Sequence, residues 1–203
     1  MPAQALITQP IVYIIDDDDI MLSVLKELVE TISAEVRTFS SAKSFLEAYR
    51  PMPCECLLLD IRMPEMGGLQ VQRALLDKGA LLPIIFISGY AEIGAAVEAM
   101  RQGAYDFVEK PVNGQTLLDK VQGALKKSRE LSARHVEGAA RQARLDLLTP
   151  KEREIVGMVV EGRSSRQISE ALGISVRTVE NHRARIMEKL HISSTVELVK
   201  LFL

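Results

Sequence analysis

Short apolar runs alternate with amphipathic segments between residues 11 and 125. Most of the runs are apolar at consecutive positions, which is typical of strands buried on both faces of a parallel sheet. They are IVYII (11–15), EVRTF (35–39), CLLLD (56–60), PIIFI (83–87) and AYDFV (104–108).

Between these runs, apolar residues recur at helical spacing. Asp18–Thr31 is one such segment, and Ser41–Tyr49, Leu69–Asp77 and Ala91–Gln102 are predicted as further helices, the last of them followed by Gly103. Five strand–helix units in succession predict an α/β fold, a doubly wound, five-stranded parallel sheet with right-handed crossovers.

The stretch from Gly114 to Leu148 contains no proline and is rich in helix-forming residues, but its apolar stripe is poor. We expect the last helix of the first domain to continue here into an interdomain linker. A flexible coil is the alternative, because Gly123 and Gly138 both weaken a helix.

A second module begins at LTPKEREIV. Thr149 precedes Pro150 and is followed three residues later by Glu152, which resembles a capping box at a helix start. Four short helices are predicted, giving a second, smaller all-α domain. Its predicted core is Leu148, Ile155, Val159, Ile168, Leu172, Ile174, Val179, Ile186 and Leu190. The predicted boundaries are 1–125, 126–145 for the linker, and 146–203.

Composition and charge fit this division. The chain is 47% hydrophobic and 26% charged, which is ordinary for a globular protein, and its net charge of −2 gives no argument for nucleic acid. Residues 144–203, however, hold 10 Lys and Arg against 8 Asp and Glu, and residues 163–189 hold six against three. A small basic module therefore follows an acidic body.

Cys54 and Cys56 are too close in sequence for a good disulfide and too few for a zinc site, so we expect buried thiols and a reducing compartment. The N-terminus shows no signal peptide, and no apolar run approaches the length of a membrane span. We expect a cytoplasmic protein that does not bind membranes.

Carboxylates follow two strands that would be neighbours in the sheet. Asp16 and Asp17 follow the first apolar run and Asp60 ends the third, so in a 2-1-3-4-5 strand order the three would converge. A divalent cation answers their mutual repulsion, and an all-oxygen site suits Mg²⁺. Asp18 and Asp19 would instead lie at a helix N-terminus, where the dipole favours anions.

Ser88 and Lys110 follow the fourth and fifth predicted strands. A hydroxyl donor and an ammonium group beside a metal complete a site for an anion, as phosphoryl transfer requires. The nucleophile would be a carboxylate, which would form an acyl phosphate.

The ordered motifs DD, LLLDIRMPEMGG, FISGYAE and FVEKP resemble the receiver domain of two-component response regulators, which has a flavodoxin-like fold. The resemblance implies that Asp60 is the phosphoacceptor. It further implies Mg²⁺ ligation by Asp16, Asp17, Asp60 and the Arg62 carbonyl, phosphate contact by Lys110, a cis Lys110–Pro111 bond, and switch roles for Ser88 and Phe107.

The segment QISEALGISVRTVENHRARIMEKL predicts a helix, a turn at Gly173 and a second helix capped by Ser175, which is a helix-turn-helix. The side chains predicted to contact DNA bases or phosphates are Arg177, Thr178, Asn181, His182, Arg185, Lys189 and Ser165. Residues 146–203 also resemble the LuxR-type effector domain.

Together the two halves resemble the NarL/FixJ group of transcriptional regulators. The resemblance implies a non-enzymatic protein phosphorylated by a sensor histidine kinase, which binds double-stranded promoter DNA as a homodimer when phosphorylated, with RNA polymerase as a further candidate partner. One alternative is a Mg²⁺-dependent phosphatase in which Asp16 is the nucleophile of an Asp16-x-Asp18 motif. Another is a receiver whose helical tail docks a protein.

Overall fold

The computed structural model describes residues 9–89 and 93–202. The N-terminal segment expected to lack a signal peptide, the Ala91 start of the fourth predicted helix and the end of the FISGYAE motif lie outside these residues. The chain divides into two compact units, Met1–Ala133 and Arg134–Leu203.

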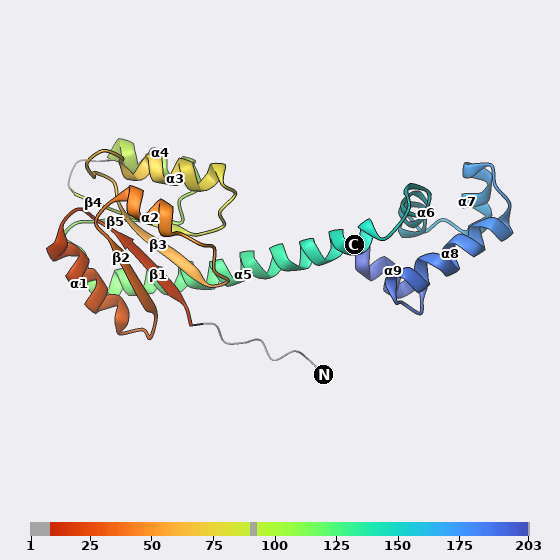
Figure 1. Cartoon of the computed structure of the whole chain (residues 1–203), viewed down its shortest axis with the longest axis horizontal. Helices are drawn as coiled ribbons and strands as arrows, with labels where there is room; N and C mark the ends of the chain where they lie inside the picture. Colours follow the sequence, from red (N-terminus) through yellow and green to blue (C-terminus); the bar gives the residue numbers. More distant parts are fainter. Residues whose placement is uncertain (1–8, 90–92, 203) are drawn as a thin grey trace. The chain divides into compact units, whose positions relative to one another are not determined.

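The N-terminal unit alternates strands and helices (Figure 1). Its elements are β1 (Ile11–Ile15), α1 (Asp19–Glu30), β2 (Glu35–Phe39), α2 (Ala42–Ala48), β3 (Glu55–Asp60), α3 (Gly68–Asp77), β4 (Ile84–Ser88), α4 (Ile93–Arg101), β5 (Asp106–Glu109) and the first part of α5 (Gly114–Asp146). The residues predicted to start helices at Asp18 and Ser41 are N-caps, whose side chains accept main-chain N–H groups.

Within the described residues, five strands form one sheet in the order β2-β1-β3-β4-β5, and every pairing is parallel. Because alternate side chains of a strand point to opposite faces, the sheet buries two apolar clusters. Helices cover both faces, so the predicted doubly wound α/β fold is confirmed.

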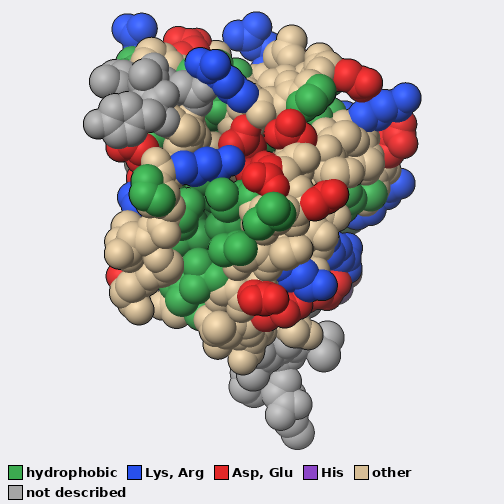
Figure 2. Space-filling view, turned by 90° about the vertical axis from the view of Figure 1, so that its left-hand side faces the viewer, with side chains coloured by type: hydrophobic (Ala, Val, Ile, Leu, Met, Phe, Trp, Pro, Cys, Tyr) green, Lys and Arg blue, Asp and Glu red, His purple; other side chains and the backbone are tan. Residues whose placement is uncertain are grey.

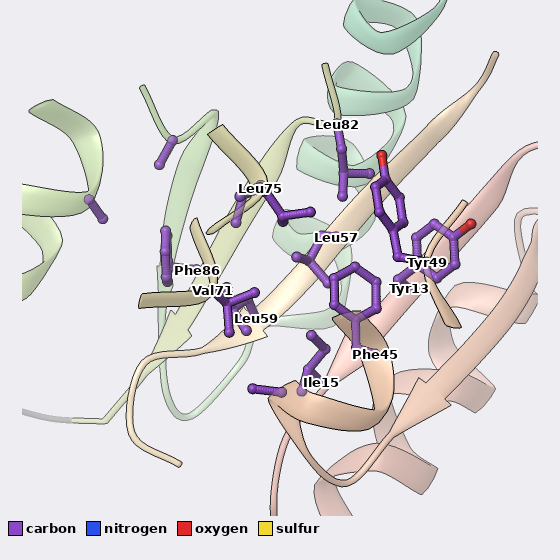
Figure 3. Close-up of a cluster of buried hydrophobic side chains, with 14 of the residues drawn as sticks. Tyr13, Ile15, Phe45, Tyr49, Leu57, Leu59, Val71, Leu75, Leu82 and Phe86 are labelled. Atoms are coloured by element: carbon purple, nitrogen blue, oxygen red, sulfur yellow. The ribbon is translucent and has the colours of Figure 1, made fainter. Parts of the chain in front are cut away.

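One cluster lies between the sheet and helices α2, α3 and α4 (Figure 3). Tyr13 of β1 contacts Phe45 and Tyr49 edge-on, with ring centroids 5.5 and 5.7 Å apart. Such edge-to-face pairs are the favoured aromatic geometry. A chain with only 4% aromatic residues thus concentrates several of them around Tyr13 of β1.

The other cluster lies between the sheet and helices α1 and α5. It contains both cysteines, which are free and buried as predicted, with 3% of Cys54 and 0% of Cys56 exposed. Arg129 of α5 donates from Nε to the Cys54 sulfur over 3.0 Å, and the Glu55 N–H donates to Ser128 Oγ over 2.9 Å. The start of β3 is therefore bonded directly to α5.

Two elements differ from the simple sequence pattern. Strand β2 is at the edge of the sheet and is only partly buried, because a strand with one neighbour has less cover. The last predicted strand, AYDFV (104–108), is displaced, because β5 begins at Asp106 and ends at Glu109.

The C-terminal unit contains the last part of α5 with α6 (Pro150–Val160), α7 (Ser165–Leu172), α8 (Val176–Leu190) and α9 (Thr195–Phe202). Thr149 and Glu152 form the predicted capping box, with Glu152 Oε2 2.8 Å from the Thr149 nitrogen. Seven of the nine predicted core residues are buried in one cluster together with Val156 and Leu198, and the other two, Leu172 and Ile174, pack against it partly buried.

Among the described residues, no helix combines the length and apolar character needed to cross a bilayer.

Candidate functional site

The carboxyl ends of β1 and β3 bring two aspartates together. The two strands are adjacent and in register, with Ile15 opposite Leu59, so Asp16 and Asp60 leave the sheet side by side. Only 2% of Asp16 and 6% of Asp60 is exposed. Figure 2 looks onto this end of the unit, where acidic side chains gather beside an apolar area.

Lys110 joins these two aspartates. It follows β5, where its N–H donates to the Ser88 carbonyl over 2.7 Å, and its side chain extends past β4 to reach β3 and β1. Its ammonium Nζ lies 2.7 Å from Asp60 Oδ1 and 3.0 Å from Asp16 Oδ2. The Lys110–Pro111 peptide bond is cis, as the resemblance implied.

The electrostatics of the site leave negative charge undercompensated. Burial raises the pKa of Asp60, and Asp16 adds to the rise, while Lys110 and the Arg62 N–H oppose it only in part. Burial alone would lower the pKa of Lys110, but its bonds to Asp60 and Asp16 raise it instead. Because two buried carboxylates share the single ammonium of Lys110, a further cation near Asp60 would be favoured.

The donor chemistry near Asp60 suits a hard cation, although the predicted ligands are not gathered into one group. Asp16 and Asp60 supply buried carboxylate oxygens, whereas Asp17 is exposed. In the part of the chain that the structure describes, no three His, Cys, Asp or Glu side chains are arranged to hold a metal ion. Two buried carboxylates that offer only oxygen donors nevertheless fit Mg²⁺, and the predicted site stays a prediction.

Asp16 has different hydrogen-bond partners from Asp18 and Asp19, which lie at the start of α1. Its Oδ1 accepts the Asp18 N–H over 2.9 Å, whereas the Asp18 side chain caps α1 by accepting from Ile20 and Met21. Asp18 and Asp19 thus lie at a helix start, as expected.

The remaining predicted residues of this site follow β3 or lie in β4 and β5. Arg62 donates its main-chain N–H to Asp60 Oδ2 over 2.7 Å. Ser88 ends β4 with 1% of its surface exposed, and its hydroxyl makes a long, 3.4 Å bond to the Gly89 carbonyl. Phe107 lies opposite Phe86 and packs against the first apolar cluster. The hydroxyl of Ser88 is therefore weakly held and available to a better acceptor.

Sequence reasoning missed the reason for Gly68. A Cβ at this position would lie 2.4 Å from the Asp60 carbonyl oxygen and 3.0 Å from the Phe86 ring. The start of α3 therefore passes against the strand end that bears Asp60, and only glycine permits the approach. The Gly67-Gly68 pair was a visible signal, but its meaning depends on a contact between elements.

The C-terminal unit has helix-turn-helix geometry in α7 and α8. Gly173 ends α7 in the left-handed region, at φ 64°, and Ser175 caps α8 by accepting the Thr178 N–H over 3.1 Å. Of the side chains predicted to contact DNA, Arg177, Asn181 and Arg185 are exposed. Thr178 and His182 are half-buried, and no described residue bonds the buried His182 Nδ1.

Lys189 and Ser165, the other two predicted contacts, take part in bonds within the unit. Lys189 Nζ lies 2.7 Å from Oε2 of the buried Glu152. Burial alone would raise the pKa of Glu152, but the bonds from Lys189 and Thr149 lower it. Arg183, which sequence reasoning missed, donates to Ser165 Oγ and to Thr195 Oγ1 over 3.3 and 2.9 Å. Arg183 therefore links α7, α8 and α9. Such a link between helices cannot be inferred from the residues next to Arg183 in the sequence.

Comparisons with known proteins match both units. Residues 12–122 match the family described as response regulator receiver domain, and residues 146–202 match bacterial regulatory proteins of the luxR family. The chain is 44% identical over 191 residues to the transcriptional regulatory protein TdiR of Thauera aromatica, covering 93% of this chain and 83% of TdiR.

Two further similarities extend over nearly the whole chain. The transcriptional regulatory protein FixJ of Azorhizobium caulinodans is 35% identical over 192 residues, which cover 95% of this chain and 91% of FixJ. The solved structure of the response regulator StyR aligns with a TM-score of 0.83 at 35% identity, over 96% of this chain and 98% of that one.

Proposed function

Because the chain belongs to the NarL/FixJ-type response regulators, which join a receiver domain to a LuxR-type DNA-binding domain, we propose that Asp60 is its phosphoacceptor. The chain is a phosphorylation-dependent transcription regulator. The observation that carries the assignment to Asp60 is the ion-pair network of Asp60, Lys110 and Asp16 at the carboxyl ends of the strands.

In the proposed reaction, a carboxylate oxygen of Asp60 attacks the phosphorus of a phosphohistidine on a sensor histidine kinase. The P–N bond breaks, the O–P bond of an acyl phosphate forms, and the released imidazole takes up a proton. Lys110 already lies 2.7 Å from Asp60 Oδ1, so its ammonium group can move from the carboxylate to a phosphoryl oxygen. Mg²⁺, held by Asp16, Asp17, Asp60 and the Arg62 carbonyl, would supply positive charge for the phosphoryl group.

The same phosphoryl group would act on Ser88 and Phe107. The weakly bonded Ser88 hydroxyl would turn towards a phosphoryl oxygen, which would vacate space beside β4. Phe107 has no hydroxyl, so its response would be one of packing against its half-buried surroundings. Phosphorylation would act by shifting the balance between two packing arrangements of Phe107, through the bond that Ser88 makes to the phosphoryl group.

We also propose which residues of the C-terminal unit contact DNA. Arg177, Asn181 and Arg185 are exposed on α8 and have the geometry for bidentate bonds to guanine or adenine. We propose that phosphorylation leads to a homodimer that binds paired promoter half-sites. A partnership with RNA polymerase stays a prediction, and no target gene is inferred from the resemblance to the regulator of a bacterial styrene-degradation pathway.

The decisive experiment treats the full-length chain with a small acyl phosphate and Mg²⁺, then maps the modified residue by mass spectrometry and measures size and DNA binding. We expect the label on Asp60, and Asp60→Asn should lose the label, the dimer and the gain in DNA affinity. Asp77→Asn, which removes an exposed carboxylate at the end of α3, is the matched control and should behave as wild type.

Other outcomes would contradict the proposal. A label on Asp16 would favour the phosphatase reading. Absence of salt-dependent binding to duplex DNA would favour a protein-docking tail, because a tail that contacted DNA phosphates would release counterions.

A further inference from the structure

A groove in the C-terminal unit has no part in the proposed function. It has a volume of about 580 Å³ and lies between the last part of α5 and the end of α9. We call it the basic groove, after the four cationic side chains that line it, Arg134, Arg141, Arg144 and Lys200. The three arginines are spaced by seven and three residues, which places them on one face of α5.

The charges of the basic groove are not balanced. Glu137 is the one carboxylate among its lining residues, against four cations. Within the described residues, no ion pair or hydrogen bond is formed by the side chains of Arg134, Arg144 or Lys200. Elsewhere in the same unit arginines do have partners, as in Arg163–Glu161 at 2.8 Å. An anion in the groove would remove the repulsion among its cations.

Arg141 lines the basic groove and is held in place by Phe202. Its Nη2 donates to the main-chain oxygen of Phe202, and its guanidinium lies 5.9 Å from the centre of the Phe202 ring. A guanidinium fixed in this way loses little freedom when it binds. Its planar set of donors, like those of Arg134 and Arg144, matches two oxygens of one phosphate group.

Gly138 also lines the basic groove. Glycine is among the poorest helix formers, yet this one lies in the interior of α5. A Cβ at this position would meet nothing within 4 Å, so packing within the protein does not require glycine. The missing side chain instead leaves the helix backbone open to a ligand.

None of the residues proposed to contact DNA lines the basic groove. Arg183 of α8 bonds to Thr195 at the start of α9, whereas Lys200 is near the other end of this helix. The eight residues of α9 correspond to about 12 Å along its axis. A small molecule also fits the volume, since ligand pockets occupy about 300–1,000 Å³. We propose that the basic groove binds a small phosphate-bearing anion.

The test is calorimetric titration of the full-length chain with ATP and with tripolyphosphate, in EDTA so that no metal takes part. We expect one site per chain, and at least tenfold weaker binding in Arg134→Gln/Arg144→Gln. Gly138→Leu should weaken binding as much, although it keeps all four cations and suits a helix better. Tighter binding of ATP would assign an organic phosphate, whereas equal affinities would assign the phosphate chain alone.

Lys126→Gln/Lys127→Gln is the matched control, because it removes two exposed cations from α5 outside the groove, and it should bind within twofold of wild type. Equal weakening in this control, or unchanged binding in Gly138→Leu, would overturn the proposal in favour of general charge attraction. Failure of the wild type to bind either probe would also overturn it. So would a fall of about two units in the salt slope of DNA binding in Arg134→Gln/Arg144→Gln, which would assign the groove to DNA.

Discussion

Lys110 provides the one ammonium that two buried carboxylates share. Sequence order predicted that Asp16, Asp60 and Lys110 would meet, because the ends of parallel strands gather at one edge. It did not predict that one ammonium would bond to both aspartates, at 2.7 and 3.0 Å. These bonds depend on how far the Lys110 side chain extends past β4. The pattern of apolar residues in a strand gives no information about this distance.

At the opposite end of the sheet, Glu55 is a buried carboxyl group that the proposed function does not use. Burial raises its pKa to about 7, although a 2.8 Å bond from the Tyr49 hydroxyl opposes the shift. No described residue bonds Glu55 Oε2. The folded protein therefore binds a proton here that the unfolded chain releases near its ordinary pKa of 4.5.

Glu55→Gln should thus change how stability depends on pH. The stability that a raised pKa provides is complete below the unfolded value and is lost as pH rises towards 7. Relative to wild type, the variant should become more stable from pH 5 to pH 7, by about 1–3 kcal/mol in total, with no further change above. Urea unfolding at several pH values measures this. Glu27→Gln, at an exposed position, should show no such trend, and a constant offset for Glu55→Gln would refute the expectation.

Gly68→Ala should disturb the site from the main-chain side. The added Cβ would lie 2.4 Å from the Asp60 carbonyl oxygen, so β3 or α3 must move, at a cost of about 1–3 kcal/mol. We expect slower phosphorylation together with lower stability in chemical unfolding. Gly94→Ala in α4, where a Cβ meets nothing within 4 Å, is the control and should be neutral or stabilising. Equal behaviour of the two variants would contradict the role of Gly68.

At the scale of elements, the sequence predicted the strands and the helix starts well. Runs such as IVYII match β1 residue for residue, because a strand buried on both faces is apolar throughout. Caps such as Thr149 with Glu152 are local, so they too were visible. Bonds that join one helix to another were not visible, and Lys189 shows the consequence. Its charge suggested a DNA contact, which stays a prediction, whereas its bond to Glu152 of α6 could not be foreseen.

Lys189→Gln tests these two roles of Lys189 against each other. It leaves the buried Glu152 carboxylate without its cation, so we expect a loss of about 1–3 kcal/mol in the stability of the C-terminal unit. The salt slope of DNA binding should stay unchanged, whereas loss of a phosphate contact would lower it by about one. The double variant Glu152→Gln/Lys189→Gln should recover part of the stability, and failure to do so would show that the pair is not coupled.

At the scale of the whole molecule, two units with separate apolar cores share one chain. Among residues 9–89 and 93–202, the cluster around Ile168 and Val179 has no members from the receiver, and the receiver clusters have none from the C-terminal unit. Damage to one core should therefore leave the other fold intact. The change of sequence pattern near residue 148 already indicated two modules. It did not decide whether the segment between them, which is the later part of α5, is a helix or a flexible coil.

Ile168→Ala should separate the two activities. Removal of a fully buried Ile side chain costs about 2–5 kcal/mol, which would unfold much of the C-terminal unit and abolish DNA binding. Phosphorylation of Asp60 should continue at the wild-type rate. Calorimetry would follow the two melting transitions, and phosphotransfer would follow the receiver. A parallel loss of phosphorylation would show that the two folds depend on each other.

The two buried thiols have a practical consequence for spectroscopy. With 3% and 0% of their surfaces exposed, Cys54 and Cys56 should react slowly with maleimides, and the chain contains no tryptophan. A cysteine introduced at the exposed Val136 would carry a spin label or fluorophore on a native background. A tryptophan introduced in either unit would be the sole indole emitter, so the motions of each unit can be recorded without first removing natural probes.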